Sequence, residues 1–202
     1  MTTGVERLAL AGPAGLLEAV LEAPAGDARG LAVLCHPHPL HGGTMDNKVV
    51  QTLARALRPC GWRTLRFNFR GVGGSQGDWD GGRGEVDDAL AAIAALRPPG
   101  LPLVLGGFSF GGYVAAQAAR RLAEPAQRLV LVAPATGNFE VAPVPQDSLV
   151  VHGESDEVVP LAATLAWARP QSLPVVVVPG CGHFFHGQLP LLKSIVARAF
   201  AV

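Results

Sequence analysis

The chain has 202 residues, 49% of them hydrophobic, and its 16 basic and 16 acidic side chains give a formal net charge of zero. This length suits a single domain over residues 1–202, which would bury roughly 70% of its unfolded surface without disulfide or metal staples. The balanced charge gives no basic surface of the kind that binds nucleic acid or an anionic membrane, so the expected partner is a small molecule. The expected assembly is a monomer or homodimer.

The cysteines and the apolar stretches narrow the class of protein further. Cys35, Cys60 and Cys181 are odd in number and lack the spacing of a metal site, which indicates reduced thiols in a cytoplasmic protein. No stretch approaches 18 uninterrupted apolar residues, so no membrane-spanning helix is expected. The apolar segment 8–17 is broken by glycine and proline and has glutamates nearby, which favours two short strands over a signal peptide.

Short apolar runs and turn signals organise the first half of the chain. Residues 5–10 and 16–22 predict a β-hairpin with its turn at Gly12-Pro13. The apolar run 31–35 predicts a buried strand, which ends at a His-Pro-His-Pro segment because proline cannot donate to a ladder. The next predicted elements are a helix over 47–57, a strand over 64–69, a glycine-dense loop, and a helix over 84–96 with an acidic first turn.

The second half continues the alternation of strand and helix. A strand over 103–108 leads into a helix to about residue 122, and strands over 128–133 and 148–152 follow. A helix over 160–167, a strand over 175–178 and a helix over 189–200 end the chain. The predicted fold class is therefore α/β, with a mostly parallel central sheet, helices on both faces and an N-terminal antiparallel hairpin.

The segment 103–112 runs an apolar strand into Gly-x-Ser-x-Gly and then into an Ala-rich helix. This pattern is typical of a nucleophile elbow, a sharp strand-to-helix turn that exposes a serine hydroxyl to a base. Gly107 and Gly111 let such a turn pack closely because they carry no Cβ. Ser109 is therefore the candidate nucleophile.

An acid and a histidine follow the last two predicted strands. Reactive groups in a parallel α/β sheet gather beyond the carboxyl ends of the strands, and Asp156 and His183 both lie at such ends. The order Ser, acid, His is that of an α/β-hydrolase triad, with His183 as the base and Asp156 orienting its ring. Glu154 and Glu157 are competing acids, interpreted as a turn partner and a solvated charge.

Backbone N–H groups should stabilise the oxyanion of such a reaction. One donor is expected from Phe110, directly after the nucleophile, and a second from the loop after the strand 31–35. The prolines in that loop have no N–H to give, so His38 is the first choice for the second donor and Leu40 the reserve.

Several longer motifs accompany these residues, in segments 35–48, 66–75, 107–112, 152–156 and 182–185. Together they resemble a small group of bacterial α/β-hydrolases, the dienelactone-hydrolase-type and short esterase proteins, and the resemblance covers essentially the whole chain. It implies an α/β-hydrolase fold and a cytoplasmic serine hydrolase. Two positions depart from the pattern, because dienelactone hydrolase proper has a cysteine where this chain has Ser109, and because the position of His41 is often aromatic in the group.

The connection between the strands over 128–133 and 148–152 is about a dozen residues, too short for a helical cap. An open site of this kind suits small or surface-presented acyl esters. The side chains expected to line its pocket are Phe108, His41, Phe184 and Phe185, with Trp79 as a further candidate.

The residues therefore predict a serine hydrolase that acts on small carboxylic esters or thioesters through an acyl-enzyme, with no cofactor and no metal. Three alternatives stay open. The cluster of His36, His38 and His41 could hold the metal of a metal-dependent hydrolase. The fold could serve as a binding protein without catalysis, and an acyltransferase or perhydrolase could use the same triad with a different acceptor.

Overall fold

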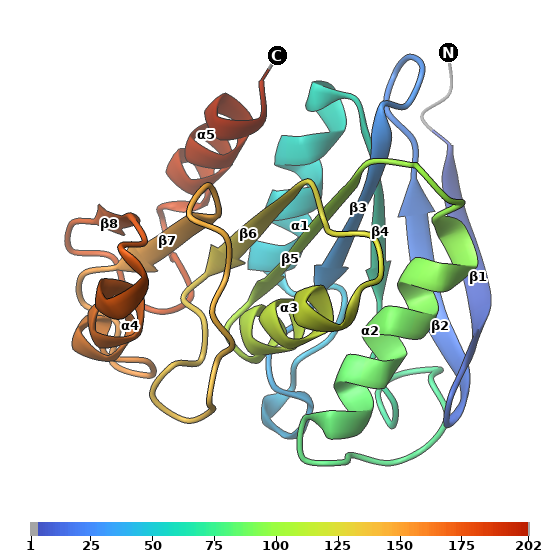
Figure 1. Ribbon diagram of the computed structural model, residues 1–202, viewed down its shortest axis with the longest axis horizontal. Coiled ribbons are helices and arrows are strands. Elements are labelled where there is room, and N and C mark those ends of the chain that lie inside the picture. Colours follow the sequence, from blue (N-terminus) through green and yellow to red (C-terminus); the bar gives the residue numbers. More distant parts are fainter. Residues whose placement is uncertain (1–3, 202) are drawn as a thin grey trace.

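The computed structural model describes residues 4–201 of the chain, and an eight-stranded sheet forms its centre (Figure 1). The strand order is β1-β2-β4-β3-β5-β6-β7-β8. The pairs β1–β2 and β2–β4 are antiparallel, and all other neighbours are parallel. The strands are β1 (Val5–Gly12), β2 (Gly15–Glu22), β3 (Gly30–Cys35), β4 (Trp62–Phe67), β5 (Leu103–Phe108), β6 (Arg128–Val132), β7 (Leu149–Gly153) and β8 (Val175–Val178).

Helices cover both faces of the sheet (Figure 1). One face is covered by α1 (Lys48–Leu57) and α5 (Leu189–Phe200), which pack against each other. The other is covered by α2 (Arg83–Leu96), α3 (Phe110–Arg121) and α4 (Leu161–Ala168). Short 3₁₀ turns lie at Pro39–His41, Arg58–Cys60 and Arg169–Gln171.

Two hydrophobic clusters, one on each face, form the core. In β3, Leu31 and Val33 point into the cluster under α2 and α3, whereas Ala32 and Leu34 point into the cluster under α1 and α5. Every residue of β3 and of β5 is buried. This is the environment of central parallel strands, which helices cover on both sides and which therefore read as continuous apolar runs.

The mostly parallel α/β sheet with its N-terminal hairpin is confirmed, and one strand is displaced from its predicted position. β4 ends at Phe67 rather than at residue 69. Phe69 donates its N–H to Nε2 of His36 at 3.0 Å, and Asn68 donates its N–H to the carbonyl of Glu18 at 2.8 Å. The N–H of Phe69 is thus bound by the side chain of His36 and not by the backbone of a neighbouring strand.

The connection between β6 and β7, residues 133–148, contains no helix and places no lid over the carboxyl ends of the strands. Among residues 4–201, no helix is both long enough and apolar enough to cross a membrane. The segments that follow β3, β5, β7 and β8 carry the candidate site.

Candidate active site

Ser109 occupies a sharp turn between β5 and α3, with φ 55° and ψ −117°. A non-glycine residue adopts a positive φ only where its surroundings hold it there. The Ser109 N–H donates to the carbonyl of Val132 at 2.9 Å, and its carbonyl accepts the N–H of Gly112 at 2.9 Å. A Cβ on Gly107 would collide with the backbone of Gly111. The strand before the turn and the helix after it thus touch, and only small residues permit this contact.

A chain of hydrogen bonds joins three of the sequence-predicted residues. Nε2 of His183 lies 3.1 Å from Oγ of Ser109, and Nδ1 of His183 lies 2.7 Å from Oδ2 of Asp156. All three side chains are buried. The loops after β5, β7 and β8 bring these residues together across 74 positions of sequence.

Asp156 is held in place by the turn that follows it. Its Oδ1 accepts the N–H groups of Val158 at 2.9 Å and of Val159 at 2.8 Å, which leaves Oδ2 for His183. Burial alone would raise the pKa of the Asp156 carboxyl, but the hydrogen bonds from His183 and from the two N–H groups outweigh burial and lower the pKa. The carboxylate is therefore ionised at neutral pH.

The two neighbouring acids have other positions. Glu154 accepts the N–H of Gly180 through Oε2 at 2.8 Å, so it ties the loop after β7 to the loop after β8. Glu157 is exposed. Neither carboxylate has a hydrogen bond to His183 among the bonds of the described residues.

His152 is a residue near the site that sequence reasoning did not single out. It is fully buried, and its Nε2 lies 2.9 Å from the carbonyl of Val159 and 3.4 Å from Oδ2 of Asp156. Burial lowers the pKa of the His152 imidazole and outweighs the hydrogen bond to Val159 and the charge of Asp156. The sequence feature that could have indicated His152 is its position near the end of β7, directly before Gly153 and the turn that carries Asp156.

The backbone N–H of Phe110 belongs to the first residue of α3, where an N–H group has no partner within the helix. In the loop after β3, the carbonyl of His38 accepts the N–H groups of His41 at 3.1 Å and Gly43 at 3.0 Å. Nδ1 of His38 accepts the N–H of Leu40 at 3.3 Å. Leu40, the reserve donor, thus has its N–H engaged in the loop itself.

His36 lies beneath this loop. Its Nδ1 lies 2.7 Å from the carbonyl of Pro37, and its Nε2 accepts the N–H of Phe69 at 3.0 Å. These partners fix the neutral tautomer with the proton on Nδ1, and burial lowers the pKa of the imidazole to about 4. Both ring nitrogens of His36 are occupied, so it cannot join His38 and His41 as a metal ligand without losing backbone partners.

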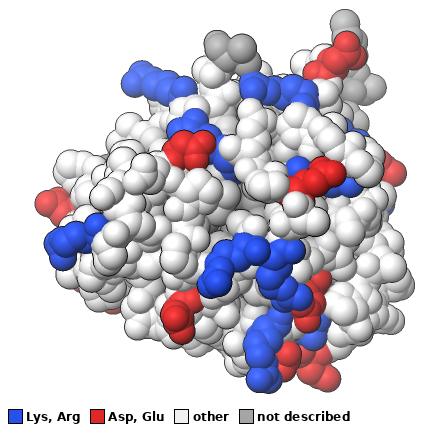
Figure 2. Space-filling model, viewed as in Figure 1, with Lys and Arg blue, Asp and Glu red and all other residues white. Residues whose placement is uncertain are grey.

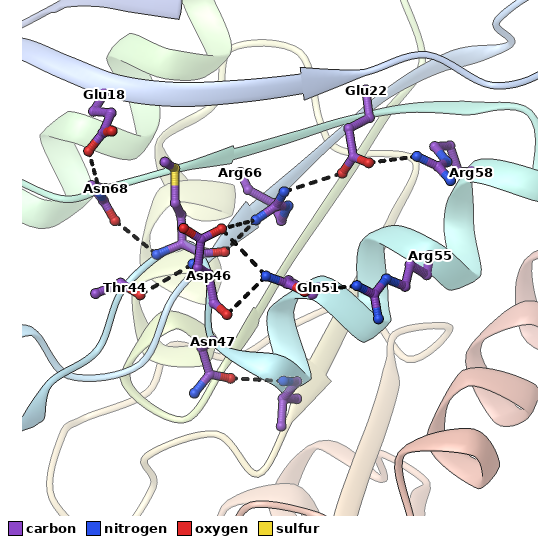
Figure 3. A network of polar contacts seen from close by, with 12 residues as sticks. Glu18, Glu22, Thr44, Asp46, Asn47, Gln51, Arg55, Arg58, Arg66 and Asn68 are labelled. Atoms are coloured by element: carbon purple, nitrogen blue, oxygen red, sulfur yellow. Dashed lines mark hydrogen bonds and ion pairs between the residues drawn. The ribbon is translucent and has the colours of Figure 1, made fainter. Parts of the chain in front are cut away.

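A network of polar contacts holds the far end of the same loop (Figure 3). Nη1 of Arg66, on β4, donates to the carbonyl of Met45 at 2.8 Å and to Oδ1 of Asp46 at 2.9 Å. Oδ1 of Asn68 accepts the N–H of Met45 at 2.8 Å, while its Nδ2 donates to Glu18 on the hairpin. Arg66 and Asn68 therefore hold Met45 and Asp46, at the end of the loop that leads into α1.

A pocket of about 180 Å³ lies between this loop and the histidine loop. Ser109 and His183 line it together with His38, His41 and Phe184. Its other lining residues, which sequence reasoning did not name, are Pro37, Gly42, Gly43, Asn47 and Val158.

Two of the four expected pocket residues lie elsewhere. Phe108 and Phe185 are fully buried in the core cluster between the sheet, α1 and α5. The ring of Phe108 packs behind His183 with centroids 4.8 Å apart, and so supports the imidazole rather than the pocket surface. Trp79 contacts the ring of His38 with centroids 4.6 Å apart, and it is not among the described residues that line the pocket.

On the face of the molecule seen in Figure 2, charged side chains lie in a few groups, one of them a run of basic side chains with acidic ones beside it, between wide uncharged areas. Among residues 4–201, no lysine or arginine lines the pocket that holds Ser109. The electrostatics of this pocket therefore come from backbone dipoles, imidazoles and the buried Asp156.

The fold, the elbow and the lidless loops define an α/β serine hydrolase architecture, and known structures share it. A structure of an α/β serine hydrolase homologue from Coxiella burnetii is 41% identical with a TM-score of 0.88, covering 100% of this chain and 99% of that one. A structure of an α/β serine hydrolase without lid from Xanthomonas campestris is 39% identical with a TM-score of 0.89, covering 98% and 94%.

Residues 27–147 match the model of the family described as serine aminopeptidase, S33. The chain belongs to this family, within the α/β-hydrolase superfamily of bacteria. An uncharacterized protein of Rickettsia prowazekii is 37% identical over 156 residues, which are 73% of this chain and 66% of that protein. The matched part thus spans just under two thirds of that relative.

Proposed function

We propose that the protein is a serine hydrolase that cleaves small carboxylic esters or thioesters through an acyl-enzyme. The observation that carries this proposal is the hydrogen-bonded chain from Asp156 through His183 to Ser109, with lengths of 2.7 and 3.1 Å. Ser109 Oγ attacks the ester carbonyl while Nε2 of His183 takes its proton. The ionised Asp156 holds the proton on Nδ1 and stabilises the imidazolium.

The bond between the carbonyl carbon and the leaving oxygen then breaks, and the leaving oxygen takes the proton from the imidazolium, which completes the acyl-enzyme. In the second half of the reaction, a water molecule gives a proton to His183 and attacks the acyl-enzyme, and His183 returns the proton to Ser109 Oγ as the acid leaves. The N–H groups of Phe110 and His38 stabilise the oxyanion in both halves. Each donor of this kind contributes about 3 kcal/mol to transition-state stabilisation. The N–H groups of His41 and Gly43 both donate to the carbonyl of His38. This supports His38 as a donor, because an oxyanion donor must be in place before charge develops.

The pocket supports small esters as the substrate. Its volume of about 180 Å³ and the lack of a helix between β6 and β7 leave little surface to cover a long acyl chain. The relatives described as serine hydrolases support hydrolysis as the reaction. The family description favours peptides as a second substrate class, through attack of the same serine on an amide.

The test is a panel of p-nitrophenyl acetate, a thioester, a lactone and an aminoacyl p-nitroanilide, assayed with the wild type and with Ser109→Ala. We expect the acetate to be hydrolysed, and kcat/KM to fall by about 10⁴-fold or more in the variant. A fluorophosphonate probe should label the wild type and not the variant. Unchanged turnover in a folded Ser109→Ala protein would overturn the proposal. Transfer of the acetyl group to an added alcohol or peroxide in preference to water would instead identify an acyltransferase or a perhydrolase.

A further inference from the structure

A second hollow, of about 390 Å³, adjoins the pocket of Ser109. The two hollows share three lining residues, Val158, His183 and Phe184, so they meet at the imidazole. We call the second hollow the histidine groove; Ser155, Glu157 and His186 are its other lining side chains that matter here. No residue of the loop that carries His38 lines it among the described residues.

The groove is built by the same turns that hold Asp156 and His183. Asp156 is buried, whereas its neighbours Ser155 and Glu157 are exposed. From residue 180 to residue 186, the odd-numbered residues are buried and the even-numbered ones are exposed, and all of these even-numbered residues line the groove. In the loop after β8, His183 thus faces Ser109 and the other buried side chains enter the core, whereas the exposed side chains of Phe184 and His186 face the groove.

The direction of the reaction decides which part of a substrate enters the groove. In the proposed mechanism, the carbonyl oxygen lies between Phe110 and His38, in the first pocket. The leaving oxygen must receive its proton from Nε2 of His183, so the leaving group extends to the side of the imidazole away from the oxyanion donors. The histidine groove meets the first pocket at Val158, His183 and Phe184 and is not lined by Phe110 or His38, so it is the hollow into which we route the leaving group.

The lining of the groove has one sign of charge. Glu157 is an exposed carboxylate, and within residues 4–201 neither hollow is lined by a lysine or an arginine. Phe184 is 46% exposed, and its ring lies 5.9 Å from that of His186 and packs edge-on against His183. A carboxylate beside an exposed aromatic ring attracts a cation, whereas an anion meets repulsion without a compensating partner.

Resting on the proposed function, we infer that the histidine groove is the leaving-group subsite, and that it favours alcohols carrying a positive charge, such as a quaternary ammonium or an amine, over neutral and anionic ones. Glu157 supplies the attraction and Phe184 the contact surface. The groove holds the alcohol part of the ester and takes no part in the bond changes at the carbonyl.

Three acetate esters of similar size test this inference. They are acetylcholine, its uncharged counterpart 3,3-dimethylbutyl acetate, and the anionic 2-sulfoethyl acetate, assayed by acetate release at low salt. For Glu157→Gln, we expect the ratio of kcat/KM for the cationic ester to that for the neutral ester to fall by about fivefold, the upper size of one exposed charge contact. The esters differ in intrinsic reactivity, but this difference is the same for every variant and cancels when the ratio is compared between variants.

Glu6→Gln is the matched control, because it makes the same change of charge on β1, at the opposite edge of the sheet from β8, and should leave the ratio unchanged. Phe184→Leu should lower the ratio by about twofold to fivefold, while retaining an apolar surface for the neutral ester. Raising the salt concentration to 0.5 M should shrink the effect of Glu157→Gln.

The outcomes separate the two proposals. Turnover of the neutral ester that depends on Ser109, together with an equal ratio in wild type and Glu157→Gln, would overturn the subsite and leave the hydrolase. A wild type that prefers the anionic ester would do the same. A wild type inactive on all three esters, or one whose turnover survives Ser109→Ala, would overturn the proposed function and the subsite with it.

Discussion

The loop after β3 and the loop after β8 both carry clustered histidines close to Ser109, but their imidazoles have different partners. His36 has the backbone carbonyl of Pro37 at one nitrogen and the backbone N–H of Phe69 at the other. His183 has a carboxylate at one nitrogen and a hydroxyl at the other. Backbone groups cannot change their protonation, so they lock a tautomer, whereas a carboxylate and a hydroxyl allow a proton to move.

The comparison teaches that histidine clustering alone does not identify a reactive site. The pKa of His36 is lowered to about 4 by burial, which keeps the ring neutral and makes it a support for the backbone after β4. His183 closes a chain that includes an ionised carboxylate, the arrangement that stabilises an imidazolium. The partners of each ring decide whether it holds the structure or transfers protons, and the following substitutions examine this difference.

The largest effect is expected from His183→Ala. Without the imidazole, no group can take the Ser109 proton, so kcat for p-nitrophenyl acetate should fall by about 10⁴ to 10⁶-fold. Circular dichroism and urea unfolding should show a folded protein. Activity within tenfold of the wild type would mean that the imidazole after β8 is not the base, and would remove the contrast between the two loops.

The second largest effect is expected from His38→Pro, with His38→Ala as its control. His38 has φ −54° and ψ 121°, which proline can adopt, so the substitution chiefly removes the backbone N–H. We expect kcat/KM to fall about 10² to 10³-fold in His38→Pro, equivalent to about 3–4 kcal/mol of transition-state stabilisation. His38→Ala keeps the N–H and should lose less than about tenfold. Equal losses in the two variants would show that the second oxyanion donor lies elsewhere.

His36 should give the protein a pH-dependent stability. The folded pKa of about 4 lies below the ordinary value of 6.5, so the unfolded chain binds the proton more readily. The free energy of unfolding is therefore fully retained above pH 6.5 and falls as the pH drops toward 4, with a contribution of about 3 kcal/mol from this one group. Urea unfolding at pH 7.5 and 4.5 should show a shallower pH dependence for His36→Gln. The other titrating groups are common to both proteins, so identical slopes would contradict the assignment.

The smallest effect is expected from Asp46→Asn. Its carboxylate pairs with Arg66 at 2.9 Å, but its side chain is 62% exposed. An exposed ion pair contributes less than about 1 kcal/mol, and Arg66 keeps its bond to the carbonyl of Met45. Urea unfolding should therefore shift by less than this amount, with kcat/KM unchanged within about twofold. A loss above about 2 kcal/mol would show that the surface ion pair, rather than the backbone contacts, holds the loop after β3.

The sequence predicted the order of the elements well because the parallel strands β3, β5, β6, β7 and β8 are mostly apolar runs that end at prolines, glycines or polar residues. The same strand ends were enough to bring Ser109, Asp156 and His183 to one edge, since a parallel sheet places all its carboxyl ends together. For these residues, the parallel topology alone predicts that they lie close together, without any prediction of which distant side chains contact each other.

What the sequence could not predict depends on partners far away in the chain. The side chain of Asn68 bridges Met45, in the loop after β3, and Glu18, on β2 and 50 residues away, so no local pattern revealed these partners. Phe185 looked like a pocket residue beside Phe184. In this loop buried and exposed residues alternate, and Phe185 lies in the core. The loop has no regular secondary structure, so there was no period in the sequence from which to predict this alternation.

The bare connection between β6 and β7 has a consequence for the timing of catalysis. Because residues 133–148 form no helix over Ser109, we expect substrate entry and product departure to need no opening or closing step. For an activated ester, the slow step should then be hydrolysis of the acyl-enzyme, visible as a rapid initial burst of p-nitrophenol followed by a slower steady rate. Added glycerol or sucrose, which slows diffusion and large motions, should leave that steady rate nearly unaffected.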